Sequence, residues 1–394
     1  MTSLDGSQAG ARVEPPLALY VHIPWCVRKC PYCDFNSHQR PEALPERRYV
    51  ARLLEDFTLQ RGRVGQRAIA SVFIGGGTPS LFSAHAVGAL LDGLRGVDSD
   101  AEITLEANPG ASDAERFSGY RAAGVNRLSI GVQSFDDAML RRIGRIHDAT
   151  QAIDAFRAAR AAGFDNINLD LMHGLPEQSG DEAMLDLRTA IDLAPEHLSW
   201  YELTLEPNTP FHHRPPSLPD GDSVADIQEA GGGRLEQAGY RRYEISAHAA
   251  GAGNRCRHNL NYWRFGDYLA IGAGAHGKLS EADGRIWRHA MRRGPRDYLA
   301  ATGEEAVSSR RELRRHDLIV EFMLNALRLV DGVPATLFTE TTGLAFDLLA
   351  RPLAEARALG LLSPVADRLQ ATPLGLSFLN DLLSLFDGNY SAHH

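Results

Sequence analysis

LALYVHIPWCVRKCPYCDF, residues 17–35, joins a short β-rich apolar run to three closely spaced cysteines. The run (17–23) is rich in aliphatic and β-branched residues and predicts a strand, and the polar stretch after it predicts a loop. On that loop, Cys26, Cys30 and Cys33 form a C-x3-C-x2-C spacing. The chain has four cysteines, three of them within eight residues. In a reducing cytosol, such clustering indicates a metal or catalytic site rather than disulfides.

Three thiolates suit an iron–sulfur cluster, because sulfur ligands favour such clusters. A [4Fe–4S] cube on three cysteines keeps one iron open, as a catalytic zinc site keeps one position for substrate. In radical S-adenosylmethionine (SAM) chemistry that iron binds SAM, and an electron from the cluster cleaves the sulfur–C5′ bond. We therefore expect a [4Fe–4S] cluster on Cys26, Cys30 and Cys33. The alternative is a zinc site completed by Asp34 or a histidine, although no second CxxC unit exists.

Outward from the cysteine loop, β-rich runs alternate with amphipathic helical stretches. The expected strands are 17–23, 71–76, 102–107, 127–133, 167–172 and 198–206. The expected helices between them include 47–60, 86–96, 113–124 and 149–163. Strands that alternate with helices form parallel βα units. We therefore expect an α/β fold built as a partial or complete βα (TIM-like) barrel.

Nearly every expected strand ends in a polar or glycine-rich cluster, and the carboxyl ends of barrel strands converge on one site. Glu106, Gln133 and Asp170 lie at or near such ends. Turns alone need Gly, Pro or Asn, not these side chains, and Asp170 inside an apolar run needs a polar partner. Arg145 lies just beyond a strand end and is either a site residue or part of a surface salt bridge. We expect one shared binding site at this edge.

The segment GGGTPS (75–80) follows the second expected strand. It matches neither the P-loop nor the dinucleotide fingerprint. Successive glycines permit unusual backbone conformations and a close approach of a ligand, and their amides could hold a carboxylate or an amine. Before the cysteines, alternation directs Tyr20 and His22 to one face, as site residues or as core aromatics.

The C-terminal part, 301–394, predicts a mostly helical, winged-helix-like domain. We expect a long amphipathic helix at 310–333, and two more helices at 344–360 and 374–386 around a hairpin that turns at Ala366 and Asp367. From residue 310 onward, eight Arg are outnumbered by ten Asp plus Glu. This balance argues against DNA reading and favours packing or partner docking.

Composition narrows the function classes further. The 394 residues are 44% hydrophobic and 23% charged, with a net charge of −9, which fits a globular protein of two or three units that does not bind nucleic acid. The N-terminal residues lack the features of a secretory signal, and no stretch approaches the roughly 18 apolar residues of a membrane span. We expect a cytoplasmic protein with a disordered tail at 1–15.

Several motifs together identify a family. They are YVHIPWCVRKCPYCDFNSH (20–38), FIGGGTPSLF (73–82), EANPG (106–110), GVQSF (131–135), GRIHD (144–148), NLDLMHGLP (168–176) and RHNLNYW (257–263). The combination resembles the heme chaperone HemW family of the radical SAM superfamily, which is related to oxygen-independent coproporphyrinogen III oxidase. The resemblance extends from residue 17 to about residue 386.

The resemblance implies a radical SAM core at 16–300, a HemW/coproporphyrinogen oxidase-like domain at 301–394, and three ligands: a [4Fe–4S] cluster, SAM and heme. The implied SAM contacts are Tyr20, Gly76, Gly77, Thr78, Glu106, Gln133, Arg145 and Asp170. It also implies heme transfer to acceptor proteins, respiratory-chain proteins among them, by a monomer or homodimer. Sequence leaves open whether SAM is cleaved.

Two features favour the chaperone over the oxidase, or over another radical SAM oxidoreductase of porphyrin metabolism. The oxidase carries a further cysteine two residues after the third, where this chain has Phe35, and a longer segment before the cysteines. The HNxxYW segment (258–263) also matches the chaperones. In it, His258 could ligate heme iron beside Tyr262 and Trp263, with Cys256 as an alternative ligand. The competing interpretation is a packed aromatic corner with a hydrogen-bonded histidine.

Overall fold

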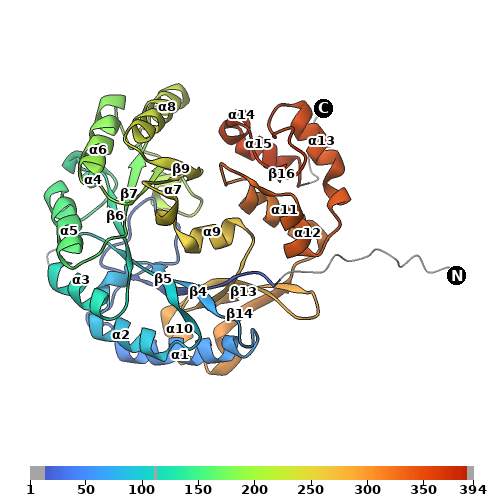
Figure 1. Ribbon diagram of the computed structural model, residues 1–394. Coiled ribbons are helices and arrows are strands. Elements are labelled where there is room, and N and C mark those ends of the chain that lie inside the picture. Colours follow the sequence, from blue (N-terminus) through green and yellow to red (C-terminus); the bar gives the residue numbers. More distant parts are fainter. Residues whose placement is uncertain (1–13, 111–112, 388–394) are drawn as a thin grey trace.

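The computed structural model describes residues 14–110 and 113–387, and within them a curved twelve-stranded sheet forms the centre of the molecule (Figure 1). Apart from β11, which is also parallel to β1 and is described below, its parallel part consists of β1 (Leu17–Ile23), β4 (Ile69–Gly76), β5 (Val97–Ala107), β6 (Arg127–Gln133), β7 (Ile167–His173) and β8 (His197–Glu202). These strands pair in this order, each parallel to the next. The expected βα barrel is therefore confirmed in its partial form. Of the expected tail at 1–15, residues 1–13 lie outside the described residues.

Further strands extend the sheet on both sides. Beside β1 lie β11 (Asp267–Ile271), β12 (His276–Ser280), β13 (Ile286–Met291) and β14 (Val307–Glu312), and beside β8 lie β10 (Ala247–Ala249) and β9 (Arg241–Glu244). The strand order runs from β14 to β9, so the described sheet is open rather than closed into a ring. Because β14 pairs with β13 beyond residue 300, the expected domain boundary there stays a prediction.

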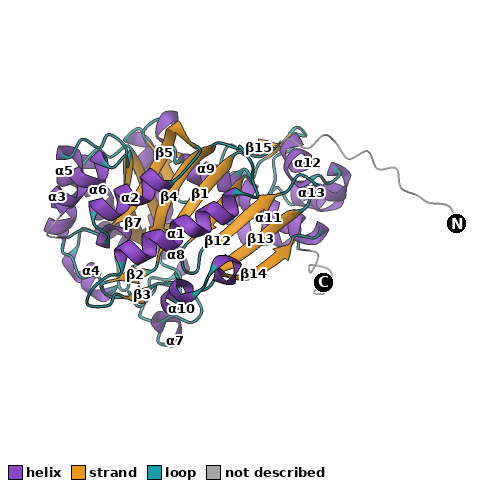
Figure 2. Ribbon diagram, turned by 90° about the horizontal axis from the view of Figure 1, so that it is seen from below, coloured by secondary structure: helices purple, strands orange, loops and turns teal. Residues whose placement is uncertain are grey.

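Helices cover the outer face of the parallel strands (Figure 2). The helices of this part are α1 (Glu46–Arg61), α2 (Ala84–Gly93), α3 (Asp113–Ala122), α4 (Asp137–Arg142), α5 (Ala149–Ala161), α6 (Gly180–Asp192), α7 (Pro210–His213), α8 (Gly221–Gln237) and α10 (Pro295–Ala300). Two of them begin with capping boxes, Asp148 with Gln151 and Ser179 with Glu182, which satisfy the first free amides of α5 and α6.

One short helix, α9 (Arg257–Trp263), lies inside the curve of the sheet instead of outside it (Figure 1). It packs against β4 and β1 on their inner face. Smaller elements complete this part: β2 (Trp25–Cys26), β3 (His38–Gln39), and the 3-10 turns at Pro79–Leu81, Ala252–Asn254 and Gly303–Ala306. Helix α9 therefore occupies part of the space inside the open barrel.

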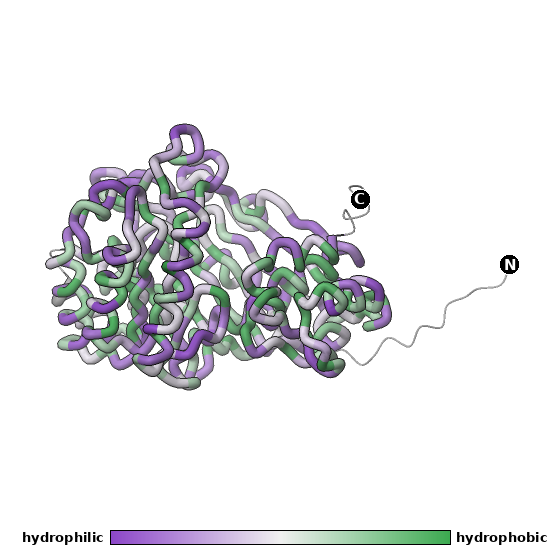
Figure 3. The backbone as a smooth tube through the Cα atoms, turned by 90° about the horizontal axis from the view of Figure 1, so that it is seen from above, coloured by the Kyte–Doolittle hydropathy of each residue, from purple (hydrophilic) through white to green (hydrophobic). Residues whose placement is uncertain are grey.

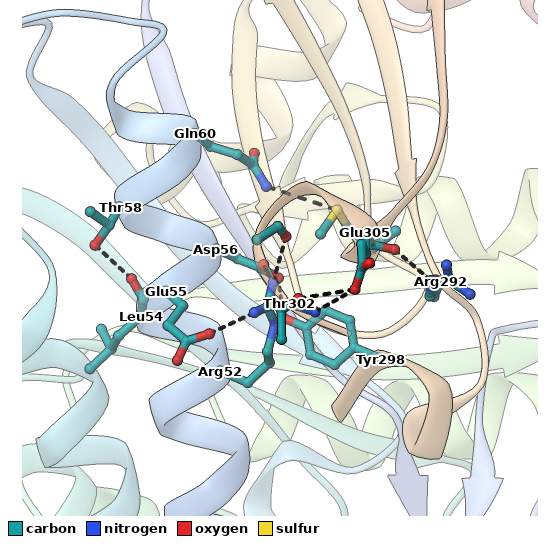
Figure 4. Close-up of polar contacts among 12 residues, drawn as sticks. Arg52, Leu54, Glu55, Asp56, Thr58, Gln60, Arg292, Tyr298, Thr302 and Glu305 are labelled. Carbon is teal, nitrogen blue, oxygen red and sulfur yellow. Dashed lines mark hydrogen bonds and ion pairs between the residues drawn. The ribbon is translucent and has the colours of Figure 1, made fainter. Parts of the chain in front are cut away.

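A buried polar cluster ties α1 to the segment that contains α10 (Figure 4). Arg52 forms an ion pair with Asp56, whose carboxylate also accepts a hydrogen bond from the Tyr298 hydroxyl. A second Arg52 hydrogen bond reaches the Gly303 carbonyl at 3.0 Å. Burial raises the pKa of Asp56, while Tyr298 and Arg52 oppose that shift.

The C-terminal part is mostly helical, as expected, and has an apolar core of its own. It contains α11 (Arg315–Ala326), α12 (Thr336–Thr342), α13 (Ala350–Ala358), α14 (Pro373–Ser377), α15 (Leu379–Ser384), a 3-10 turn at Phe346–Leu349, β15 (Val333–Pro334) and β16 (Arg368–Leu369). The core reaches the barrel through Phe265, whose ring contacts Phe322 at a centroid distance of 5.7 Å.

Two expectations for this part need correction. The helix expected at 310–333 spans only Arg315–Ala326, because residues up to Glu312 complete β14 and pair with β13. The expected hairpin is reduced to a single antiparallel bridge between Leu362 and Ala371. Its β16 residues pair with β15 instead. Long-range pairing decided both outcomes, and a local pattern does not contain it.

Hydrophobic and hydrophilic stretches alternate along the chain in both parts of the molecule (Figure 3). This is the pattern of elements with one face in a core and one in water. None of the described helices combines the length and the apolar character that a bilayer crossing requires.

Candidate cofactor site at the carboxyl ends of the strands

Three thiols line one cavity at the carboxyl ends of the parallel strands. Cys26, Cys30 and Cys33 all border this cavity of about 340 Å³, and none of them forms a disulfide. The loop that carries them is held by backbone bonds, including the Cys33 amide to the Cys30 carbonyl at 3.2 Å. Burial raises the pKa of the Cys26 and Cys33 thiols. The structure thus brings the three predicted ligands together around one space.

The cavity differs from a site for a single metal ion. Among residues 14–110 and 113–387, no three His, Cys, Asp or Glu side chains are grouped as one ion requires. A four-iron cube separates its corners, so its thiolates border a wider space than one ion does. This arrangement of thiols fits a cluster, and the zinc alternative gains no support from it.

The glycine loop packs directly against the cysteine loop. A Cβ added to Gly77 would lie 2.6 Å from the Trp25 carbonyl oxygen and 3.0 Å from the Cys26 sulfur. Gly76 has φ +122°, where L side chains are strained. These glycines therefore allow the glycine loop to approach the cysteine loop closely. The sequence had suggested a close approach of a ligand instead.

The amides of this loop are already used inside the chain. Those of Gly77 and Thr78 donate to the carbonyls of Ile23 and Trp25, each at 2.8 Å. The Gly76 amide donates to a Glu106 carboxylate oxygen at 3.1 Å. The donors of these three amides are therefore used inside the chain, and ligand contacts at this loop stay a prediction.

Two half-buried carboxyl groups, those of Glu106 and Asp170, face the same cavity. Burial and, second to it, the charge of the nearby Asp170 together raise the pKa of Glu106 to about 8, against the opposing Gly76 bond. Asp170 accepts hydrogen bonds from Ser129 at 3.1 Å and Asn168 at 2.8 Å, and burial raises its pKa too. Glu106 therefore carries a proton at neutral pH until a cation arrives to stabilise its ionised form.

Arg145 and Gln133 complete this wall. Arg145 donates to the Asn108 amide oxygen at 2.6 Å and approaches the Cys30 sulfur at 3.8 Å. It is therefore no surface salt bridge. Gln133 ends β6 with φ +72°, a strained conformation for a side chain of this kind, and accepts a hydrogen bond from Tyr201 at 2.9 Å.

Tyr20 and His22 lie on one face of β1, as the alternation predicted. The Tyr20 hydroxyl and the His22 Nδ1 are 2.9 Å apart, and the His22 Nε2 is 2.9 Å from the Asn36 carbonyl. Both residues border a second, larger cavity next to the first. Tyr20 therefore does not line the cavity of the cysteines directly.

His258 lies at the opposite, lower end of the barrel. Its Nδ1 is 3.0 Å from the Ser71 hydroxyl, and its Nε2 is 2.9 Å from the Tyr262 hydroxyl. The side chain is 1% exposed, and burial lowers its pKa to about 3. Nearby Cys256 is also buried, and burial raises its thiol pKa to about 12. This is the packed aromatic corner, and heme ligation by His258 would require one of its hydrogen bonds to break.

Sequence reasoning missed several residues that line the two cavities. Tyr201, Asn108 and Ser199 border the first, and His276 and Arg293 border the second. Asn108 lies in the quoted EANPG motif, so its position after a strand could have identified it. His276 follows the glycine-rich segment GAGA (272–275), where Gly272 lies close to the backbone of His22 on β1.

Two family models match this chain. The radical SAM superfamily model matches residues 20–190, and the HemN C-terminal domain model matches residues 313–378. Among curated relatives, the heme chaperone HemW of Escherichia coli (strain K12) is 51% identical over 375 residues, which cover 94% of this chain and 98% of the relative. The heme chaperone HemW of Bacillus subtilis (strain 168) is 34% identical, with the same coverage of both chains.

A solved structure shares the fold. Coproporphyrinogen III oxidase (HemN) from Escherichia coli, described as a radical SAM enzyme, superposes with a TM-score of 0.80. It is 24% identical, over 97% of this chain and 92% of the oxidase. At that identity the match shows the architecture alone.

Proposed function

This chain belongs to the heme chaperone HemW family of the radical SAM superfamily, and from this premise we propose that it binds heme and passes it to acceptor proteins. Membership in the superfamily implies a [4Fe–4S] cluster and SAM as cofactors. The observation that carries the proposal is the single cavity that Cys26, Cys30 and Cys33 share at the strand ends.

The residues around that cavity fit the implied groups. Cys26, Cys30 and Cys33 are free thiols that would hold three irons, and the Arg145 guanidinium lies 3.8 Å from the Cys30 sulfur. When bound, the cluster would supply the electron for cleavage of SAM. We propose SAM contacts at Tyr20, Gly76, Gly77, Thr78, Glu106, Gln133, Arg145 and Asp170. The carboxyl groups suit an ammonium or ribose hydroxyls, and the guanidinium suits a carboxylate.

Two cysteine variants, one at the site and one away from it, test the cluster assignment. Cys30→Ser should abolish cluster assembly after anaerobic reconstitution, because two thiolates do not hold the cube tightly. Cys256→Ser is the matched control, since Cys256 is buried far along the chain and does not line the cavity. Iron and labile sulfide per chain should fall to background in the first variant and stay complete in the second. Full iron and sulfide in Cys30→Ser would refute the assignment.

The chaperone function is separated from the oxidase by product analysis. Under anaerobic conditions with SAM, a reductant and coproporphyrinogen III, we expect no protoporphyrinogen. With heme, we expect a stable complex whose heme moves to apo-forms of respiratory heme proteins in isolated membranes, faster than free heme does. Protoporphyrinogen formation would instead favour the oxidase. We further propose a cytoplasmic location, and a monomer or homodimer stays a prediction.

A further inference from the structure

A second cavity of about 640 Å³ lies beside the cysteine cavity. The two share Phe35, Gly76, Glu106 and Trp263 in their linings. The remaining walls come from β1, the cysteine loop, β11, β12, β13, α9 and, through Asn325, from the C-terminal α11. Its volume is in the range that holds a large cofactor or ligand.

Flat aromatic side chains dominate one wall of this cavity. Tyr262 and Tyr268 meet edge to face at a centroid distance of 4.4 Å, and Trp263 continues from Tyr262 along α9. The indole N–H of Trp263 is buried and has no hydrogen-bond partner among the residues that the structure describes. Such a wall suits a flat, largely apolar macrocycle.

The two histidines that line this cavity, His22 and His276, are placed differently. His276 begins β12, where its backbone pairs with β13, and its exposed imidazole forms no hydrogen bond with the residues that the structure describes. Partial burial, with Arg288 and Arg293 nearby, lowers its pKa and so keeps its imidazole neutral at pH 7. A neutral imidazole is the form that ligates iron. By contrast, His22 in the same lining is buried and engaged through both ring nitrogens.

The positive charges of the cavity are not equally available. Arg288 is paired with Glu321 at 2.7 Å, and Lys278 with Asp267 at 2.9 Å. Arg293 is exposed and, in the described part of the chain, forms no ion pair; its side chain reaches only the Asn36 amide oxygen, at 3.5 Å. An unpaired guanidinium at the rim suits a carboxylate of the ligand.

The carboxyl groups that line the cavity repel a negatively charged ligand only weakly. Burial, with Asp170 nearby, raises the pKa of Glu106 to about 8, so this group is mostly uncharged at neutral pH. Asp34 is exposed to solvent, where its charge is screened.

We propose that this second cavity is the heme site, with His276 as the axial iron ligand and Arg293 pairing with a propionate. The proposal rests on the proposed function and gives its cargo a location. It also explains the HNxxYW segment: Tyr262 and Trp263 form the wall, while His258 fastens α9 to the barrel. Heme would then lie next to the cysteine cavity, separated from it by shared residues.

Ferric heme titrated into the cluster-loaded protein tests the ligand, with difference spectra against heme-free samples. His276→Ala should shift the Soret band and weaken binding by at least about tenfold. Added imidazole should restore the band in His276→Gly. His213→Ala is the matched control, because His213 is also exposed but lies on α7, away from the cavity. His258→Ala should keep the wild-type spectrum.

An unchanged spectrum and affinity in His276→Ala would overturn the ligand, and a lost band in a folded His258→Ala would return that role to His258. If the wild-type protein bound no heme at all, the proposed function itself would fail, which distinguishes the two outcomes.

The carboxylate partner needs a separate test. Arg293→Glu should weaken heme binding about fivefold to tenfold, yet leave binding of heme dimethyl ester unchanged, because the ester has no propionate charge. Equal losses for both ligands, or none, would refute the propionate contact.

Discussion

The barrel interior has two polar layers, of which the lower is buried and the upper is partly exposed to a cavity. The lower layer, around Glu102 and His258, is held by hydrogen bonds within the chain, although the buried Arg127 Nε has no partner among the described residues. The upper layer, around Glu106 and Arg145, surrounds a cavity and contains the three cysteines. Buried polar residues alone therefore do not identify a binding site. The two layers differ in whether their polar groups are bonded within the chain or border a space that a ligand can fill.

The lower layer is organised by one carboxylate. Glu102 on β5 accepts hydrogen bonds from the backbone amides of Arg257 and His258, both at 3.1 Å, and from the Cys256 thiol at 3.5 Å. It thereby caps α9, whose own N-terminal residue offers no side-chain cap. It also balances the charge of Arg127, which is 2% exposed.

The largest effect should follow from removal of that carboxylate. Glu102→Ala leaves Arg127 without its countercharge and the first amides of α9 without acceptors. We expect a loss of about 3–5 kcal/mol in the free energy of unfolding, measured by urea denaturation. Glu55→Ala is the control, because Glu55 is an exposed partner of Arg52 and should cost less than about 1 kcal/mol. A loss below that value in Glu102→Ala would show that the lower layer is not a self-contained structural unit.

The upper layer was much easier to predict from sequence than the lower. Strands β1 and β6 have the predicted bounds, because their apolar runs are continuous and end in polar clusters. The cysteine spacing is local as well, so nearby residues in the sequence already contain it.

The lower layer depends on contacts between distant segments. Ser71 and His258 are 187 residues apart in the chain, and β11 pairs with β1 across a similar gap. No local pattern shows that a histidine in an aromatic segment turns toward a strand rather than toward a ligand. His276 could not be identified from sequence for the same reason. It borders the second cavity because β12 pairs with β13 in the extended sheet, which is a long-range contact.

The next effect concerns pH and the upper layer. Burial raises the Glu106 pKa from its ordinary value of 4.5 to about 8, so the folded chain binds a proton that the unfolded chain has released between those two values. Stability should therefore fall as pH rises through this window. Glu106→Gln retains the acceptor for Gly76 but cannot ionise. We expect it to be about 1–3 kcal/mol more stable than wild type at pH 8.5, and equally stable near pH 4.5.

Urea midpoints at a series of pH values, without SAM, check this difference. Glu55→Gln, at an exposed position, should parallel the wild type throughout. Parallel curves for Glu106→Gln as well would mean that Glu106 is ionised in the folded chain, and that the upper layer is as fully paired as the lower.

The smallest effect should come from Arg145→Lys. Lysine keeps the positive charge beside Cys30 but cannot contact the Asn108 amide, the Gly131 carbonyl and a ligand at once, as the planar guanidinium does. We expect an unchanged iron content and a SAM affinity about tenfold lower, which corresponds to about 1.4 kcal/mol. Equilibrium dialysis of SAM with the cluster-loaded protein measures it. Arg142→Lys, in the same region but paired with Glu177 at 2.9 Å, should bind SAM as the wild type does. If Arg145→Lys also kept full affinity for SAM, the role of Arg145 would be limited to stabilising the cysteine loop. The carboxyl groups of the upper layer would then account for SAM binding.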